Sequence, residues 1–141
     1  MASFNKFNAF AENVYEGVHD LGADTLKVML TLTAPTATDA VKADLTEISA
    51  GNGYTAGGTT TVQSSSAQTS GTYKLVVADV VFTASGGAIA DFRYAVLYND
   101  TPTSPADALI GYWDYGSTVS MADGETFTWD TDPTNGVLQH A

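Results

Sequence analysis

Two histidines, His19 and His140, are the side chains that could serve as a base for nucleophilic catalysis. Such catalysis needs the base within hydrogen-bond reach of a serine or threonine hydroxyl. His19 follows a predicted helix, where an imidazole interacts favourably with the carbonyl end of the helix dipole. His140 is one residue from the C-terminus, where a frayed tail is the simpler interpretation. Neither position indicates a catalytic residue.

The 16 acidic residues could supply the paired carboxylates of a glycan-degrading enzyme, which lie roughly 5–10 Å apart in glycoside hydrolases. Asp114 lies between Trp113 and Tyr115, and aromatic rings of this kind stack on sugars. Trp113 also fits the alternation of a strand, however, which favours a core position. Among so many acids some pairs arise by chance, so the pattern supports this chemistry only weakly.

One predicted turn gathers the oxygen ligands that calcium prefers, from Asp130, Asp132 and Asn135. The spacing differs from that of an EF-hand loop and no bidentate glutamate follows, which favours a solvated turn. The glycines of residues 51–53 and 57–58 match neither the dinucleotide-binding nor the P-loop pattern. The sequence therefore predicts no catalytic residue, no metal ligand and no cofactor, and the protein is not expected to be an enzyme.

Composition predicts a single globular domain of 141 residues, because 44% are hydrophobic and 11% aromatic. We expect residues 1–22 to form an N-terminal helical segment and residues 23–141 a β-rich body. The formal charge of −11 disfavours direct binding to nucleic acid or to anionic membranes. With no cysteine, disulfides and thiol catalysis are excluded. No apolar run approaches the roughly 20 residues of a membrane span, and the first residues lack the apolar core of a secretion signal, so synthesis in the cytoplasm is expected.

Residues 44–58 separate the helical start from the strands that follow. Asn52–Gly53 and Gly57–Gly58 are strong turn signals, because glycine adopts positive φ without a steric clash. Tyr54 is the lone aromatic residue between these turns. We therefore expect an ordered structural loop that Tyr54 anchors.

The N-terminal segment has the periodicity of a helix over residues 4–18, with Ser3 as its N-cap and a stop at residues 20–22. Its apolar face consists of Phe4, Phe7, Ala11, Val14 and Val18, with Phe10 beside it. Residues 25–33 alternate as a half-buried strand, and residues 36–49 have the spacing of a short helical turn.

The remainder predicts strands separated by turns. Residues 59–63 form a short strand, residues 64–71 a polar loop, and residues 72–83 a long strand with a bulge near residues 78–79. Residues 89–99 are the most apolar strand and are expected to be central, before a proline-containing loop at residues 99–107. Further strands are predicted at residues 108–115, 117–121, 125–130 and 137–140. The fold class is mainly β: an antiparallel β-sandwich or small barrel with an N-terminal α-helix.

Five runs taken in order resemble a group of small structural proteins of tailed bacteriophages. They are residues 24–31 (DTLKVMLT), 47–58 (EISAGNGYTAGG), 92–100 (FRYAVLYND), 109–116 (LIGYWDYG) and 123–129 (DGETFTW). The runs extend over almost the whole chain and are scaffold motifs, so the resemblance brings no catalytic residues with it.

The resemblance implies a virion component, and three placements follow from it. A capsid decoration (cement) protein, commonly a trimer that clamps neighbouring copies of the major capsid protein, is favoured by the size, the acidity and the aromatic N-terminal segment. A tail or head–tail component is the alternative, and a receptor-binding module is the third. In each case the expected partners are further copies of the chain and other virion proteins.

Five apolar side chains are candidates for an assembly interface: Phe4, Phe7, Phe10, Met29 and Tyr54. Each is also a suitable core residue. We favour the core over the interface for all of them.

Overall fold

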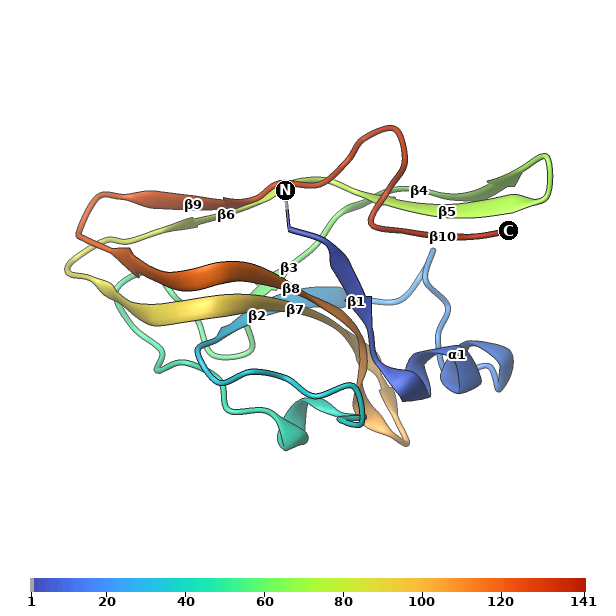
Figure 1. Ribbon diagram of the computed structural model, residues 1–141, viewed down its shortest axis with the longest axis horizontal. Coiled ribbons are helices and arrows are strands. Elements are labelled where there is room, and N and C mark those ends of the chain that lie inside the picture. Colours follow the sequence, from blue (N-terminus) through green and yellow to red (C-terminus); the bar gives the residue numbers. More distant parts are fainter. Residues whose placement is uncertain (1) are drawn as a thin grey trace.

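Two layers of antiparallel strands make up about half of the chain, as the computed structural model of residues 2–141 shows (Figure 1). The first layer is a five-stranded sheet in the order β1 (Phe4–Lys6), β8 (Ala106–Met121), β7 (Ile89–Thr103), β2 (Leu26–Thr31) and β3 (Thr59–Thr60). The second contains β10 (Leu138–His140), β5 (Thr72–Val77) and β4 (Gln63–Thr69), with the pair β6 (Val80–Thr83) and β9 (Thr126–Trp129). The sandwich predicted from the sequence is confirmed, and the sheets do not close into a barrel.

The main core lies between the two layers, and aromatic side chains of one layer pack against those of the other. Trp113 of β8 meets Trp129 of β9 edge to face, with 4.9 Å between ring centroids. Phe92 of β7 meets Phe127 of β9 in the same way, also at 4.9 Å. These geometries are the ones that aromatic pairs prefer. The two layers are thus joined through the strands with the most aromatic residues.

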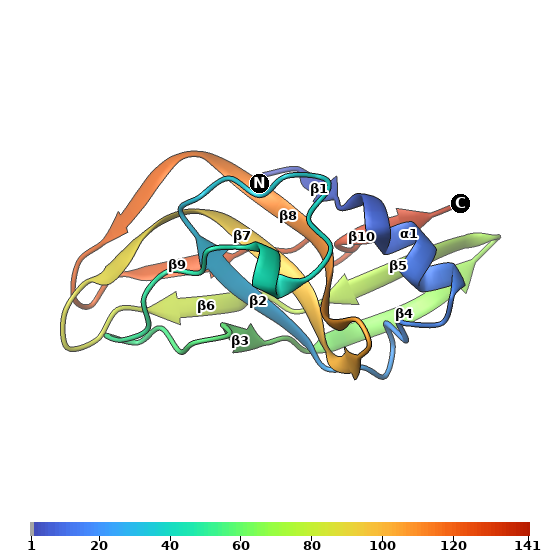
Figure 2. The ribbon, with the colours of Figure 1, turned by 90° about the horizontal axis from the view of Figure 1, so that it is seen from below.

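The prediction that residues 89–99 form a central strand is confirmed, because β7 lies in the middle of the five-stranded sheet. The prediction that the strand at residues 25–33 is half buried is wrong. In β2, Val28 and Leu30 face the main core, while Met29 belongs to a second buried cluster on the other side of the sheet. The segment around the short 3-10 helix η1 (Lys42–Asp44) covers that outer face (Figures 1 and 2). This turn confirms the helical turn predicted within residues 36–49.

The predicted helix at residues 4–18 is shorter, because its first residues form a strand. Phe4–Lys6 pairs with β8 as β1, and α1 spans Asn8–Tyr15. Ser3 is not the cap: Phe7 occupies the N-cap position without a side-chain hydrogen bond. The ring of Phe4 lies over Gly111 and beside Trp113, at 5.4 Å between ring centroids. The contact explains why pairing with β8 overrides the helical periodicity.

Two predicted loops are strands. The polar residues 64–71 belong mostly to β4, which pairs with β5, and the hairpin of β7 and β8 extends through most of residues 99–107. The strand predicted at residues 72–83 divides into β5 and β6 at the predicted irregularity. There the Asp79 carboxylate accepts hydrogen bonds from the amide and hydroxyl of Thr131, at 2.8 and 2.9 Å. In the described part of the chain no helix is long and apolar enough to cross a membrane.

Gly58 lies where the loop meets β2, and it has no room for a side chain. Its φ is +81°, and a Cβ would overlap the carbonyl group of Val28. Gly116 has almost the same φ, +84°, with nothing near its Cβ position.

We predict that Gly58→Ala destabilises the fold by roughly 1–3 kcal/mol more than Gly116→Ala, because only the former adds a clash to the cost of positive φ. Urea unfolding of the two variants measures the difference. Equal destabilisation would contradict the tight contact between the loop and β2.

Candidate functional site

A network of polar side chains holds residues 44–58 along the edge of β2, with Leu45 on the outer face of the first sheet and the Tyr54 ring in the main core. Glu47 is at its centre. One carboxylate oxygen, Oε1, accepts a hydrogen bond from the Tyr54 hydroxyl at 2.7 Å and another from the Gly57 amide at 2.6 Å. The other oxygen, Oε2, is 3.1 Å from the Lys42 ammonium group. The Tyr54 hydroxyl in turn accepts a hydrogen bond from the Leu30 amide at 3.0 Å, which ties the loop to β2.

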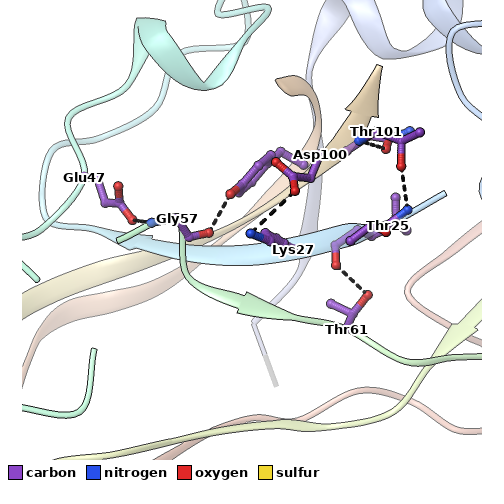
Figure 3. Close-up of polar contacts among 10 residues, drawn as sticks. Thr25, Lys27, Glu47, Gly57, Thr61, Asp100 and Thr101 are labelled. Carbon is purple, nitrogen blue, oxygen red and sulfur yellow. Dashed lines mark hydrogen bonds and ion pairs between the residues drawn. The ribbon is translucent and has the colours of Figure 1, made fainter. Parts of the chain in front are cut away.

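A second set of contacts continues this network along the sheet (Figure 3). The Tyr98 hydroxyl donates to the Gly57 carbonyl at 2.6 Å, and Lys27 lies 3.5 Å from the Asp100 carboxylate. Beyond them, Thr101 Oγ1 accepts a hydrogen bond from the Thr25 amide at 2.8 Å (Figure 3). Each contact joins a loop residue to a strand, or one strand to its neighbour.

The electrostatics of this network favour uncharged phenols. Burial raises the pKa of Tyr54. The hydrogen bond from the Leu30 amide lowers this pKa in part, while the hydrogen bond to Glu47 and the negative charge of Glu47 raise it. Burial likewise raises the pKa of Tyr98. Burial also raises the pKa of the Asp107 carboxyl, and the hydrogen bond between Asp107 and Asp100 raises it as well. Because both phenols stay protonated at neutral pH and Glu47 is already bonded through both oxygens, the arrangement is suited to holding the loop.

His19 is buried at the other end of the sheet and is held by Asn99. The Asn99 side-chain amide lies 3.0 Å from His19 Nδ1 and 2.7 Å from an Asp24 carboxylate oxygen. Because the Asn99 amide is a donor, Nδ1 is the acceptor and the proton of the neutral ring is on Nε2. Nε2 has no hydrogen-bond partner among residues 2–141. Burial lowers the pKa of His19, and the charge of Asp24 opposes this only in part.

His140 lies beside α1, where its Nε2 is 3.3 Å from the Tyr15 hydroxyl. The two side chains border a groove of about 350 Å³ between α1 and the edge of the second layer. Phe10, Val14 and Leu138 line the groove's apolar interior. His19, His140 and Ser66 line a second pocket beside α1. The Ser66 hydroxyl is paired there with the Tyr73 hydroxyl at 2.8 Å, and neither histidine is hydrogen-bonded to a serine or threonine in the described residues.

Asp114 forms an ion pair with Arg93 on the neighbouring strand, through contacts of 2.8 and 3.1 Å. The Arg93 hydrogen bond, and after it the Gly116 amide, lower the pKa of the Asp114 carboxyl. Trp113 is buried and Tyr115 packs against Phe127, so neither ring is presented as a platform for a sugar. Asp114 thus links β7 to β8.

The turn considered for calcium is closed by its own hydrogen bonds. Asp132 Oδ1 accepts from the amides of Thr134 and Asn135, at 2.7 and 2.8 Å, and these contacts lower its pKa. Asn135 donates its side-chain amide to the other Asp132 oxygen at 2.8 Å. Over residues 2–141, no three histidine or acidic side chains are grouped as metal ligands.

The five residues considered for an interface are mostly inside the protein. Phe7, Phe10, Met29 and Tyr54 are buried, and Phe4 is partly buried against Trp113. Their burial agrees with the favoured core interpretation. In the folded chain, the four buried side chains offer no surface to a partner, because the sheets and the loop cover them.

The sequence interpretation missed Glu47, Asn99 and Asp79, although these residues organise the polar contacts. A lone acidic or amide residue near a glycine-rich turn carries no pattern of its own, since its partners are distant in sequence. Only Tyr54, between two turn signals, could be singled out, and its predicted anchoring role is confirmed. No family model, curated protein or solved structure matches the chain.

Tyr54→Phe should lower the free energy of unfolding by about 1–3 kcal/mol, because the buried Leu30 amide and Glu47 each lose a partner. Tyr15→Phe is the matched control: Tyr15 is 74% exposed, and we expect its change to stay within about 0.5 kcal/mol. Denaturant unfolding measures both. Equal effects would contradict the anchoring role of Tyr54.

His19 should make stability depend on mildly acidic pH. Its pKa is lower in the folded chain than the value of about 6.5 expected on unfolding, so the unfolded state binds more protons between these two values. The free energy of unfolding should therefore fall as pH drops below about 6.5 and level off above it.

Thermal unfolding between pH 7.5 and 5.0 tests this on three proteins. As the pH falls over this range, the melting temperatures of the wild type and His140→Gln should decrease by similar amounts, and that of His19→Gln should decrease less. A decline that is unchanged in His19→Gln would contradict the assignment.

Proposed function

We propose that the chain is a non-catalytic structural protein of a bacteriophage virion, a capsid decoration protein that binds the outside of the shell and stabilises it. One observation carries the proposal: the residues with the best potential for chemistry are bonded within the fold. Their contacts hold loops and strands in place. The resemblance in the five sequence runs supplies the class of particle.

Three contacts illustrate this use of polar side chains. His19 is fixed by Asn99, Asp114 by Arg93, and Asp132 by the amides of its own turn. A catalytic acid or base needs a lone pair or proton directed at a substrate. Here the carboxylate oxygens of Asp114 and Asp132 and the Nδ1 atom of His19 are directed at the protein itself, and the other His19 nitrogen, Nε2, is buried. These contacts support a structural role.

Charge supports a place on the outside of the capsid. Of the five basic residues in the chain, Lys27, Lys42 and Arg93 are paired with carboxylates of the same chain. The paired basic groups leave the net charge of −11 uncompensated on the rest of the surface. Packaged DNA repels such a surface, whereas binding to the exterior of a protein shell does not require approach to phosphate.

The proposed partners are the major capsid protein and further copies of the chain, in a virion whose parts are made in the host cytoplasm. The trimer that the resemblance implies stays a prediction. A loop fastened as firmly as residues 44–58 suits a protein that must hold its shape against a shell. A tail or head–tail position is the alternative, and a receptor-binding module is the third.

Antibody labelling of intact particles by electron microscopy tests the placement. We expect label distributed over the capsid, and we expect particles that lack the protein to lose DNA at lower temperature than complete ones. Label on the tail alone, with a bare capsid, would contradict decoration and favour the alternative.

A further inference from the structure

Strand β4 is the outer edge of the three-stranded sheet and has a partner on one side only. It spans Gln63–Thr69 and pairs with β5, while its other side has no strand partner among residues 2–141. Six of its seven residues are exposed. Figure 1 shows the β4–β5 hairpin extending to one end of the molecule, and Figure 2 shows β4 on the border of its layer.

This edge has neither the charges nor the proline that keep strand edges apart. Exposed edges in soluble proteins are commonly protected by charged residues, proline or a covering element. The sequence of β4 is QSSSAQT, which contains no charge and no proline. Val62, directly before it, is 67% exposed, more than any other large aliphatic side chain of the described residues. The backbone donors and acceptors on this side are therefore open to another strand.

The charge distribution favours a second copy of this chain as the occupant. Two copies carry −11 each and repel one another over most of their surfaces. Between Glu47 and Asp79 there is no acidic residue, the longest such interval in the chain, and β4 lies inside it. The only charged residue in that interval is Lys74, on β5 opposite Ala67. In space, the segment that contains Asp20 and Asp24 reaches β4 at Gln63 and Ser66. Away from these two contacts, the β4 edge is the stretch of strand that two copies can bring together with the least repulsion.

We propose that β4 pairs antiparallel with β4 of a second copy across a two-fold axis, which joins the two three-stranded sheets into one of six strands. An antiparallel contact between identical edges is self-complementary and closes after two copies. This two-fold contact is separate from the trimer that the resemblance implies. It does not depend on where the protein sits in a particle, because it concerns the purified chain.

Charge placed on the edge tests the contact. In Ser65→Glu/Gln68→Glu the glutamate at position 68 can still accept the Gly71 amide hydrogen bond that Gln68 accepts. Positions 65 and 68 lie on opposite faces of β4, so each dimer then carries two added carboxylates on each face of the joined sheet. We expect the dissociation constant of the dimer to rise at least about tenfold in sedimentation equilibrium. The matched control, Ser117→Glu/Ser120→Glu, adds the same charge to exposed positions of β8 and should leave the dimer unchanged.

Distances between spin labels test the antiparallel pairing of the two β4 strands. Because the chain has no cysteine, a single introduced cysteine is the only site that is labelled. Cysteine is placed in turn at Ser65, Ala67 and Thr69, on one face of β4. In a two-fold dimer, the distance between the two labels at equivalent positions should be shortest at the residue nearest the axis, within β4. It should grow by about 13 Å for every two residues away from that position, because the two strands run in opposite directions. A label at Ser120 should give a longer distance than this minimum.

Four results would overturn the inference. The first two are a wild-type protein that stays monomeric at high concentration and a dimer that both double variants weaken equally. The third is a set of label distances without a minimum in β4. The fourth is a trimer that Ser65→Glu/Gln68→Glu does not affect. The last result would leave capsid decoration standing, since a trimer uses a different contact. Label on the tail of intact particles, with the β4 dimer intact, would remove the decoration proposal alone.

Discussion

The hydroxyl of Tyr54 makes the contact on which the position of residues 44–58 depends. It accepts a hydrogen bond from the Leu30 amide in β2 and donates one to Glu47, which also holds Gly57 and Lys42. A single phenol therefore connects a strand of the first sheet to both ends of the loop. Its burial excludes the water that would otherwise compete for these bonds.

The loop allows the first sheet to be buried on both faces. Its inner face packs on the second layer through rings such as Trp113 and Trp129. Its outer face carries Met29 and Val96, which would be exposed without Leu45 and the neighbouring segment. At roughly 1.5–3 kcal/mol for a fully buried large apolar side chain, this second cluster is a substantial part of the stability. The same contacts bring carboxylates, phenols and lysines together, and each of these groups serves the packing.

The sequence predicts the parts of this fold in which local pattern and tertiary position agree. The central strand β7, the break between β5 and β6, and the anchoring by Tyr54 all follow from apolar alternation or turn chemistry. β4 could not be predicted in this way, because a polar strand exposed on both faces has no alternation. β1 could not be predicted either, because Phe4 fits a helical face as well as it fits the surface over Gly111. The pairing of Arg93 with Asp114 depends on the register of β7 against β8, which no short run of residues encodes.

A structural protein needs the loop at residues 44–58 to stay closed, whereas a catalytic loop would need to open. Hydrogen exchange of the Leu30 and Gly57 amides measures this directly, because both donate to atoms of the Tyr54 and Glu47 network. We expect both amides to exchange only through global unfolding, with a free energy of exchange that falls with denaturant as steeply as the free energy of unfolding. Exchange of Gly57 through a local opening that is insensitive to denaturant would contradict it.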